Sequence, residues 1–277
     1  MKKRDKKRNT KENLHFSAIR NHLHKCKHSQ VAIFVIIALI IVVSISLIYI
    51  FVSKPEIGVK AEENPQAYIE QCIEPILEEA ETSILKHGGY VQVSELNKEY
   101  DGEKRAYLCY VEGEEELCIN KEPMLIPNIE QEIYNDIESK IEGCFDSLEE
   151  EFVNYDYYAQ PTNLEIEVRP NQLVAKIRKE ITITREGSTR KVELFDTYID
   201  SPLYDMVVII TDILNQEVSC NCPYETCNAD IMQLAKQYRN FEVERFVTGD
   251  NEKLYTVKEI LSEKEFVFAV RNCIFWG

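Results

Sequence analysis

The longest apolar run of the chain extends from Val31 to Val52 and contains no charged residue. At about 1.5 Å of rise per residue, an α-helix of this length spans about 33 Å, which is enough to cross the hydrocarbon core of a bilayer. We therefore expect one transmembrane helix at residues 31–53, with Val31, Phe34, Ile50 and Val52 among its anchoring residues.

Apolar residues recur at helical spacing in the segment that follows a short linker, residues 54–64. Asn64-Pro65 offers an N-cap and a first-turn proline, and an apolar stripe then runs from Ile69 to Ile84. His87-Gly88-Gly89 is a typical helix end, and Pro75 predicts a kink within the helix.

A second apolar stripe takes every fourth position from Ile129 to Ile141 and predicts another helix. Asn128 and Gln131 are its expected capping residues, and Gly143 is its expected end.

Between these two helices the sequence predicts a strand at Tyr90–Ser94 and then a β-hairpin. With Gly113 and Glu114 at the centre of a two-residue type II′ turn, Cys109 and Cys118 face each other at a non-hydrogen-bonded site. The expected distance between their Cα atoms, about 4.5 Å, lies within the range of disulfides.

Beyond residue 158 the apolar period changes from helical to two. Leu164–Val168 and Leu173–Ile183 alternate apolar with polar residues and predict antiparallel strands, turned at Glu186-Gly187-Ser188. Further elements are expected as a helix from Ser201-Pro202 to about Val218, a short helix at 229–238, and strands near 241–248, 254–260 and 265–274, the last apolar enough to be central. The predicted fold class is α+β, with a helical and hairpin subdomain at 65–150 and a subdomain of antiparallel sheet plus helices at 151–277.

Charge is divided unevenly around the apolar run. Residues 1–30 carry ten Lys or Arg against two acidic residues, a net charge of +8, whereas residues 54–277 carry a net charge of −24. Because basic flanks stay on the cytoplasmic side, residues 1–30 are expected to be a cytoplasmic tail that contacts anionic lipid headgroups, and the C-terminal part is expected outside the cytoplasm.

The cysteines divide in the same way as the charge. Cys26 lies in the tail, and eight cysteines follow the apolar run, an even number that indicates disulfides in an oxidising compartment. Cys72 and Cys144 are placed to join the two predicted helices. The pairing of the remaining four stays open: Cys220, Cys222, Cys227 and Cys273. Two structural disulfides, a four-thiolate metal site and a redox-active pair all fit this set, and the oxidising compartment favours the disulfides.

Other candidate chemistry is sparse. Four of the five histidines lie in the tail, which leaves His87 as the only one available to a nucleophilic triad or zinc site outside it. No glycine-rich nucleotide loop is present, and the many carboxylates do not single out a glycosidase pair. We therefore expect no catalytic residue, no metal, no cofactor and no nucleic-acid partner.

Two further groups each have a common and a rarer interpretation. His22, His24, Cys26 and His28 recur at alternate positions, as in a metal-binding strand, although a lipid-contacting segment is the commoner arrangement for so basic a stretch. The tyrosines around 155–158 suggest either a hinge packed between subdomains or a stacking platform for glycans.

The stretch from Ser29-Gln30-Val31 into the apolar run, with Cys72 on the first helix and then Gly88-Gly89-Tyr90, resembles a group of single-pass surface proteins of small-genome archaea. The resemblance implies an archaeal envelope protein. Gln30 at the start of the apolar run is also similar to the cleavage position of archaeal class III pilin signals. Phe34 stands where those signals carry an acidic residue, and Pro55 interrupts the helix that would form a filament core.

These observations favour a membrane-anchored, non-enzymatic binding or structural protein of the cell envelope, with the bilayer and an envelope protein as partners. The alternatives are a pilin-like filament subunit and a membrane-tethered thiol–disulfide oxidoreductase.

Overall fold

A computed structural model describes residues 37–41, 60–93, 95–220, 222, 227–248 and 252–273. The chain forms two compact units, Met1–Gly58 and Val59–Gly277. The second unit contains, in order, α3 (Pro65–Lys86), β1 (Asn97–Tyr100), β2 (Glu103–Tyr110), β3 (Ile119–Asn120), α4 (Leu125–Glu151), β4 (Asp156–Ala159), β5 (Asn163–Arg169), β6 (Gln172–Arg185), β7 (Ser188–Leu194), β8 (Thr197–Asp200), α5 (Leu203–Glu217), α6 (Ile231–Gln237), β9 (Phe241–Val247), β10 (Lys253–Glu259) and β11 (Glu265–Arg271).

In the first unit, residues 37–41 are helical and exposed. The rest of the expected transmembrane helix lies outside the described residues, as do the tail and the anchoring residues Val31, Phe34, Ile50 and Val52. Among the helices of the described residues, none combines the length and apolarity that crossing a membrane requires.

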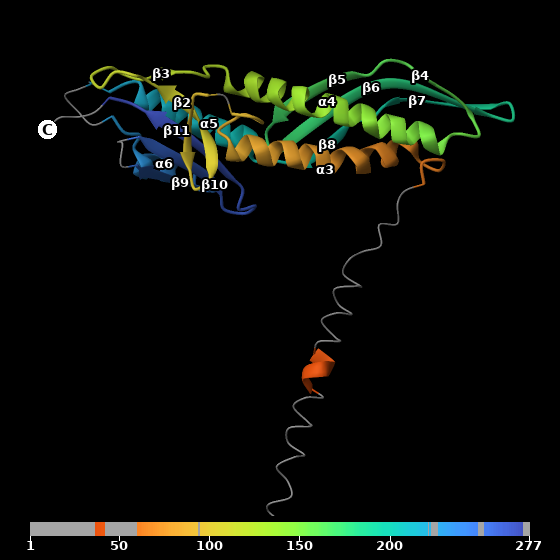
Figure 1. Cartoon of the computed structure of the whole chain (residues 1–277), viewed down its shortest axis with the longest axis horizontal. Helices are drawn as coiled ribbons and strands as arrows, with labels where there is room; N and C mark the ends of the chain where they lie inside the picture. Colours follow the sequence, from red (N-terminus) through yellow and green to blue (C-terminus); the bar gives the residue numbers. More distant parts are fainter. Residues whose placement is uncertain are drawn as a thin grey trace, which may run out of the picture. The chain divides into compact units, whose positions relative to one another are not determined.

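The helix α3 follows its capping signals. The Asn64 side chain accepts a hydrogen bond from the backbone N–H of Ala67 at 3.3 Å, and the helix ends at His87. Gly88 and Gly89 take positive φ values of 73° and 98°, the backbone conformation that favours glycine at a helix end. Figure 1 shows α3 and α4 running side by side, and their buried isoleucine stripes face the same core.

The helix α4 is longer at both ends than the sequence predicted. It begins at Leu125, before the expected cap at Asn128, and continues through Gly143 to Glu151. The apolar stripe explains the extension, because Phe145 and Leu148 continue it and are buried. Burying such side chains outweighs the roughly 1 kcal/mol cost of one glycine within a helix.

The strands form two sheets. In the first, the order is β1-β2-β11-β10-β9, with β3 also paired to β2; in the second, β6 lies at the centre and pairs with β4, β5, β7 and β8. The central position expected for β11 is confirmed. The strand pairs that the structure describes are antiparallel, as expected, except that β11 runs parallel to β2 and makes the first sheet mixed.

The expected strand at Tyr90–Ser94 is also wrong for residues 90–93. The backbone N–H of Val91 donates to the Glu132 carboxylate at 3.2 Å, and the Val91 carbonyl lies 3.1 Å from Nδ1 of His87. Side chains thus satisfy the backbone groups that a strand partner would otherwise satisfy.

The structure pairs Cys109 with Cys118, but not in the expected hairpin register. Cys109 lies opposite Asn120, and the two cysteine Cα atoms are 5.4 Å apart. Gly113 lacks the positive φ that a type II′ turn requires, so the predicted two-residue turn is wrong. The reason is a competing contact, because the backbone N–H of Cys118 donates to the Asn272 side chain at 2.9 Å.

The predicted alternation in β5 and β6 matches the structure, including the turn at Glu186–Gly187, where both residues have positive φ. One inward position of β6 is occupied by a cation, Lys179, whose amine lies 2.9 Å from the Glu142 carboxylate and 4.7 Å from the Phe145 ring centre. This ion pair and the ring stabilise the charge of a nearly buried lysine.

The helix α5 contacts strands of both sheets and α4. We expected a boundary between two subdomains at residue 150. The first sheet crosses this boundary, because β2, which precedes residue 150, pairs with β11, which follows it. Most buried apolar side chains of the described residues belong to one large hydrophobic cluster, and Val59–Gly277 forms one compact unit.

We predict that replacing both Cys72 and Cys144 with Ala destabilises the protein more than replacing both Cys109 and Cys118. The first disulfide joins α3 to α4 across a sequence separation of 72 residues, and the second closes a separation of 9. From the loop entropy, removing the first disulfide lowers the unfolding free energy by about 4 kcal/mol, and removing the second lowers it by roughly 2–3 kcal/mol. Urea unfolding of both variants measures the difference, and equal or inverted losses would show that the helix pair does not depend on this bond.

Candidate functional site

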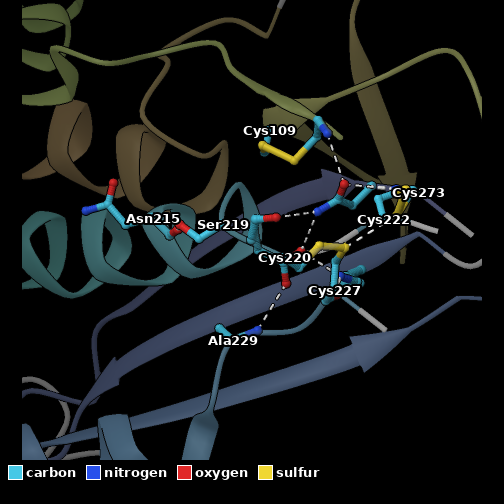
Figure 2. Close-up of a disulfide and its surroundings, with 12 residues drawn as sticks. Cys109, Asn215, Ser219, Cys220, Cys222, Cys227, Ala229 and Cys273 are labelled. Carbon is cyan, nitrogen blue, oxygen red and sulfur yellow. Dashed lines mark hydrogen bonds and ion pairs between the residues drawn. A yellow bond between two sulfur atoms is a disulfide. The ribbon is translucent and has the colours of Figure 1, made fainter. Parts of the chain in front are cut away.

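The four cysteines whose pairing the sequence left open meet at the end of α5. Cys220 pairs with Cys227, with Cα atoms 5.3 Å apart, and Cys222 pairs with Cys273, with Cα atoms 6.2 Å apart. Figure 2 shows these two disulfides beside each other, with the disulfide of Cys109 nearby. The site therefore joins the segment after α5 to the end of β11.

The sulfur atoms of the two disulfides are in contact. Sγ of Cys227 lies 3.3 Å from Sγ of Cys273, and the sulfurs of Cys220, Cys227 and Cys273 all lie within 4.8 Å of one another. Three thiolates at this spacing could contribute to a zinc site, but a sulfur that is bonded in a disulfide has no thiolate to offer. With both bonds formed, the cluster is a covalent cross-link.

Next to the sulfur cluster lies a buried carboxylate, Glu217, the last residue of α5, which has no solvent exposure. It accepts hydrogen bonds from the amine of Lys253 at 2.6 Å, from the hydroxyl of Tyr255 and from the side-chain amide of Asn272 at 3.1 Å. The backbone N–H of Ala229 donates to it as well, at 3.3 Å. A buried charge persists only when it is paired and hydrogen-bonded in this way.

Asn272 connects this carboxylate to the cysteines. Its side-chain N–H donates to the Glu217 carbonyl at 2.7 Å, and its side-chain oxygen accepts from the backbone N–H groups of Cys118 and Cys273, each at 2.9 Å. The amine of Lys253 also donates to the carbonyl of Cys227. We call Glu217, Lys253, Tyr255 and Asn272 the buried network; it contacts three of the four disulfides through these bonds.

The electrostatics of the buried network favour a structural role. Burial lowers the pKa of the Lys253 amine, and the Glu217 carboxylate opposes that shift. Burial, followed by the negative charge of Glu217, raises the pKa of the Tyr255 hydroxyl and keeps it protonated as a donor. Because Glu217 is fully enclosed, the network stabilises the fold and does not present a base to a substrate.

Sequence reasoning missed the buried network, although one signal was present. Glu217 continues the apolar stripe of α5 at helical spacing from Ile210 and from the pair Ile213 and Leu214. A carboxylate in an otherwise apolar stripe indicates a buried, paired acid. Its partners on β10 and β11 cannot be read from the sequence, because only the tertiary fold brings them together.

The other candidates from the sequence have ordinary surroundings. His87 caps α3, and its Nε2 lies 3.5 Å from the Glu103 carboxylate. In the tyrosine group, Tyr155 and Tyr157 pack on the buried ring of Phe152, while Tyr158 is exposed. Two of the rings thus pack within one compact unit, and both the hinge and the stacking platform stay predictions. The tail histidines and Cys26 lie outside the described residues.

Comparison of the chain with family models, with curated proteins and with solved structures finds no match.

We predict that Glu217→Gln lowers the unfolding free energy by about 3–5 kcal/mol, because it leaves the buried Lys253 cation without its counter-charge. Glu180→Gln is the matched control: its partner Lys191, at 3.1 Å, is exposed, and such pairs contribute about 1 kcal/mol or less. Adding Lys253→Met to Glu217→Gln should recover part of the loss. Denaturant unfolding measures all three, and similar losses for Glu217→Gln and Glu180→Gln would contradict the structural role.

Proposed function

We propose that this chain is a single-pass membrane protein whose ectodomain, residues 54–277, is a non-enzymatic binding or structural component of the cell envelope. The observation that carries the proposal is that all eight cysteines after the apolar run are joined in disulfides. Disulfides persist in oxidising compartments, which supports an extracytoplasmic location for this part.

The sequence supports the same topology independently. The tail of net charge +8 precedes an apolar run long enough to span a bilayer. In this arrangement the tail contacts anionic headgroups on the cytoplasmic side, and the acidic ectodomain meets an envelope partner outside.

Two features support the non-enzymatic part of the proposal. The cysteines of the sulfur cluster are bonded to one another, and the strongly paired Glu217 is enclosed. The first therefore carries no free thiol, and the second presents no carboxylate to solvent.

A second candidate, a membrane-tethered thiol–disulfide oxidoreductase, is favoured by the 3.3 Å distance between the sulfurs of Cys227 and Cys273. If an external dithiol reduces the bond between Cys222 and Cys273, the Cys273 thiolate is placed to attack Cys227, which forms a new bond and releases Cys220 as a thiolate. Mild dithiol treatment would then expose two thiols per chain, whereas structural disulfides would stay closed.

The topology is tested by labelling thiols of the full chain with a membrane-impermeant maleimide. Intact cells should give no label, because Cys26 is inside and the remaining cysteines are bonded. Permeabilised cells should give one label per chain, which Cys26→Ser abolishes. As a positive control, Leu261→Cys places a thiol on a side chain that is 88% exposed and should label in intact cells.

Label on Cys26 in intact cells would reverse the topology and contradict the proposal. Several labels without reductant would contradict the disulfides. No label after permeabilisation would mean that the tail has been removed before Gln30, as the pilin alternative expects.

A further inference from the structure

The first sheet has a second face, opposite the one that packs on the main core. Tyr107, Leu254 and Ala269 form a small apolar cluster there, with Tyr110 packed against it. Leu254 lies between Lys253 and Tyr255 on β10, and alternate residues of a strand point to opposite faces. The second face is therefore the reverse side of the strands that hold the buried network.

This face is concave. The strands β1 and β9 are at opposite ends of the sheet order, yet the rings of Tyr100 on β1 and Phe246 on β9 lie 5.3 Å apart. The amine of Lys98 on β1 also reaches Glu252, just before β10, at 2.5 Å. The sheet thus curls over its second face, which carries an open pocket of about 570 Å³, within the usual size range of small-molecule sites.

The lining of the pocket is polar and aromatic. Every lining residue except Leu96 carries a charged, hydroxyl or amide group; the lining comprises Glu95, Leu96, Asn97, Lys98, Tyr107, Tyr110, Glu252 and Arg271. Among these residues Glu252 is almost buried; it pairs with Lys98 and accepts a hydrogen bond from the Tyr107 hydroxyl. A polar lining of this kind suits a hydroxyl-rich ligand better than a lipid.

Arg271 is the residue of the pocket that can bind a negatively charged group of a ligand. Its guanidinium lies 3.8 Å from Glu252, too far for a close hydrogen bond, and its side chain is 39% exposed. The guanidinium carbon lies 5.7 Å from the Tyr110 ring centre, and the amine of Lys121 lies 5.8 Å from that ring. Two cations, Lys98 and Arg271, therefore lie beside the nearly buried carboxylate of Glu252, and an incoming carboxylate finds a fork-shaped donor on Arg271.

We infer that this pocket binds an acidic saccharide, such as a glycan that contains uronic acid. The apolar C–H face of a sugar packs on tyrosine rings, its hydroxyl groups reach Glu252 and Asn97, and its carboxylate pairs with Arg271. The exposed rings of Tyr100 on β1 and Phe246 on β9, which contact each other, offer a surface for a second sugar unit. This inference deepens the proposed function and rests on it, since it names the ligand class of an extracytoplasmic binding protein.

The test is calorimetric titration of the full chain in nanodiscs with a galacturonic acid trisaccharide, and with maltotriose as the neutral probe. We expect saturable binding of the acidic sugar and at least tenfold weaker binding of the neutral one. Arg271→Met should weaken binding of the acidic sugar at least tenfold, and Tyr110→Ala should weaken binding of both.

The matched control is Arg185→Met, which removes another guanidinium that lies over a tyrosine ring, 4.9 Å from Tyr155, in a separate pocket. It should leave binding unchanged. Equal loss in Arg185→Met and Arg271→Met would show a general charge effect and overturn the inference. Equal affinity for both sugars, or no binding of the acidic one, would overturn it as well.

Thermal melting of each variant identifies a folding defect. If Arg271→Met has one, Arg271→Lys replaces it, because this variant keeps the charge but loses the fork-shaped donor. Because this titration does not depend on orientation in a cell, its failure is distinct from failure of the topology labelling.

Discussion

The buried carboxylate of Glu217 holds together β10, the end of β11 and the segment before α6. Its charge has no access to water, so the fold must supply Lys253, Tyr255, Asn272 and the N–H of Ala229 around it. Those donors come from β10, from the residue after β11 and from the segment before α6. A shift of β10 would leave a buried charge unpaired, and a shift of either of the other two segments would remove a hydrogen-bond donor from it; both are more costly than losing an exposed ion pair.

The buried network lies on one face of the first sheet, and the pocket lies on the other. Glu252 and Lys253 are neighbours in sequence, and so are Arg271 and Asn272; one member of each pair lines the pocket and the other belongs to the buried network. The groups of the pocket are thus attached to strand ends that the network and the disulfides hold in place. Pre-ordering of this kind lowers the entropic cost of binding a ligand.

Local signals predicted much of this fold. The caps of α3, the apolar alternation of β6 and the apolar stripe of α5 each lie within one segment, and the structure contains each element close to its expected bounds. One local signal was overlooked, the Asp101-Gly102 turn between β1 and β2, where both residues have positive φ.

The errors arose where distant residues decide the outcome. The hairpin register depends on Asn272, 154 residues from Cys118, and the parallel pairing of β2 with β11 joins segments from the two halves of the chain. The pocket was missed for the same reason, because Lys98 and Glu252 meet only when the sheet curls. Neither periodicity nor spacing within one segment carries that information.

The most direct test of the central role of Glu217 is amide hydrogen exchange in the full chain and in Glu217→Gln. The amides of Cys118, Ala229 and Cys273 donate to the buried network and come from three separate segments. The account predicts that in Glu217→Gln all three lose protection together, while α3 and α4 keep theirs. Loss of protection at Ala229 alone, or unchanged exchange at all three, would contradict it.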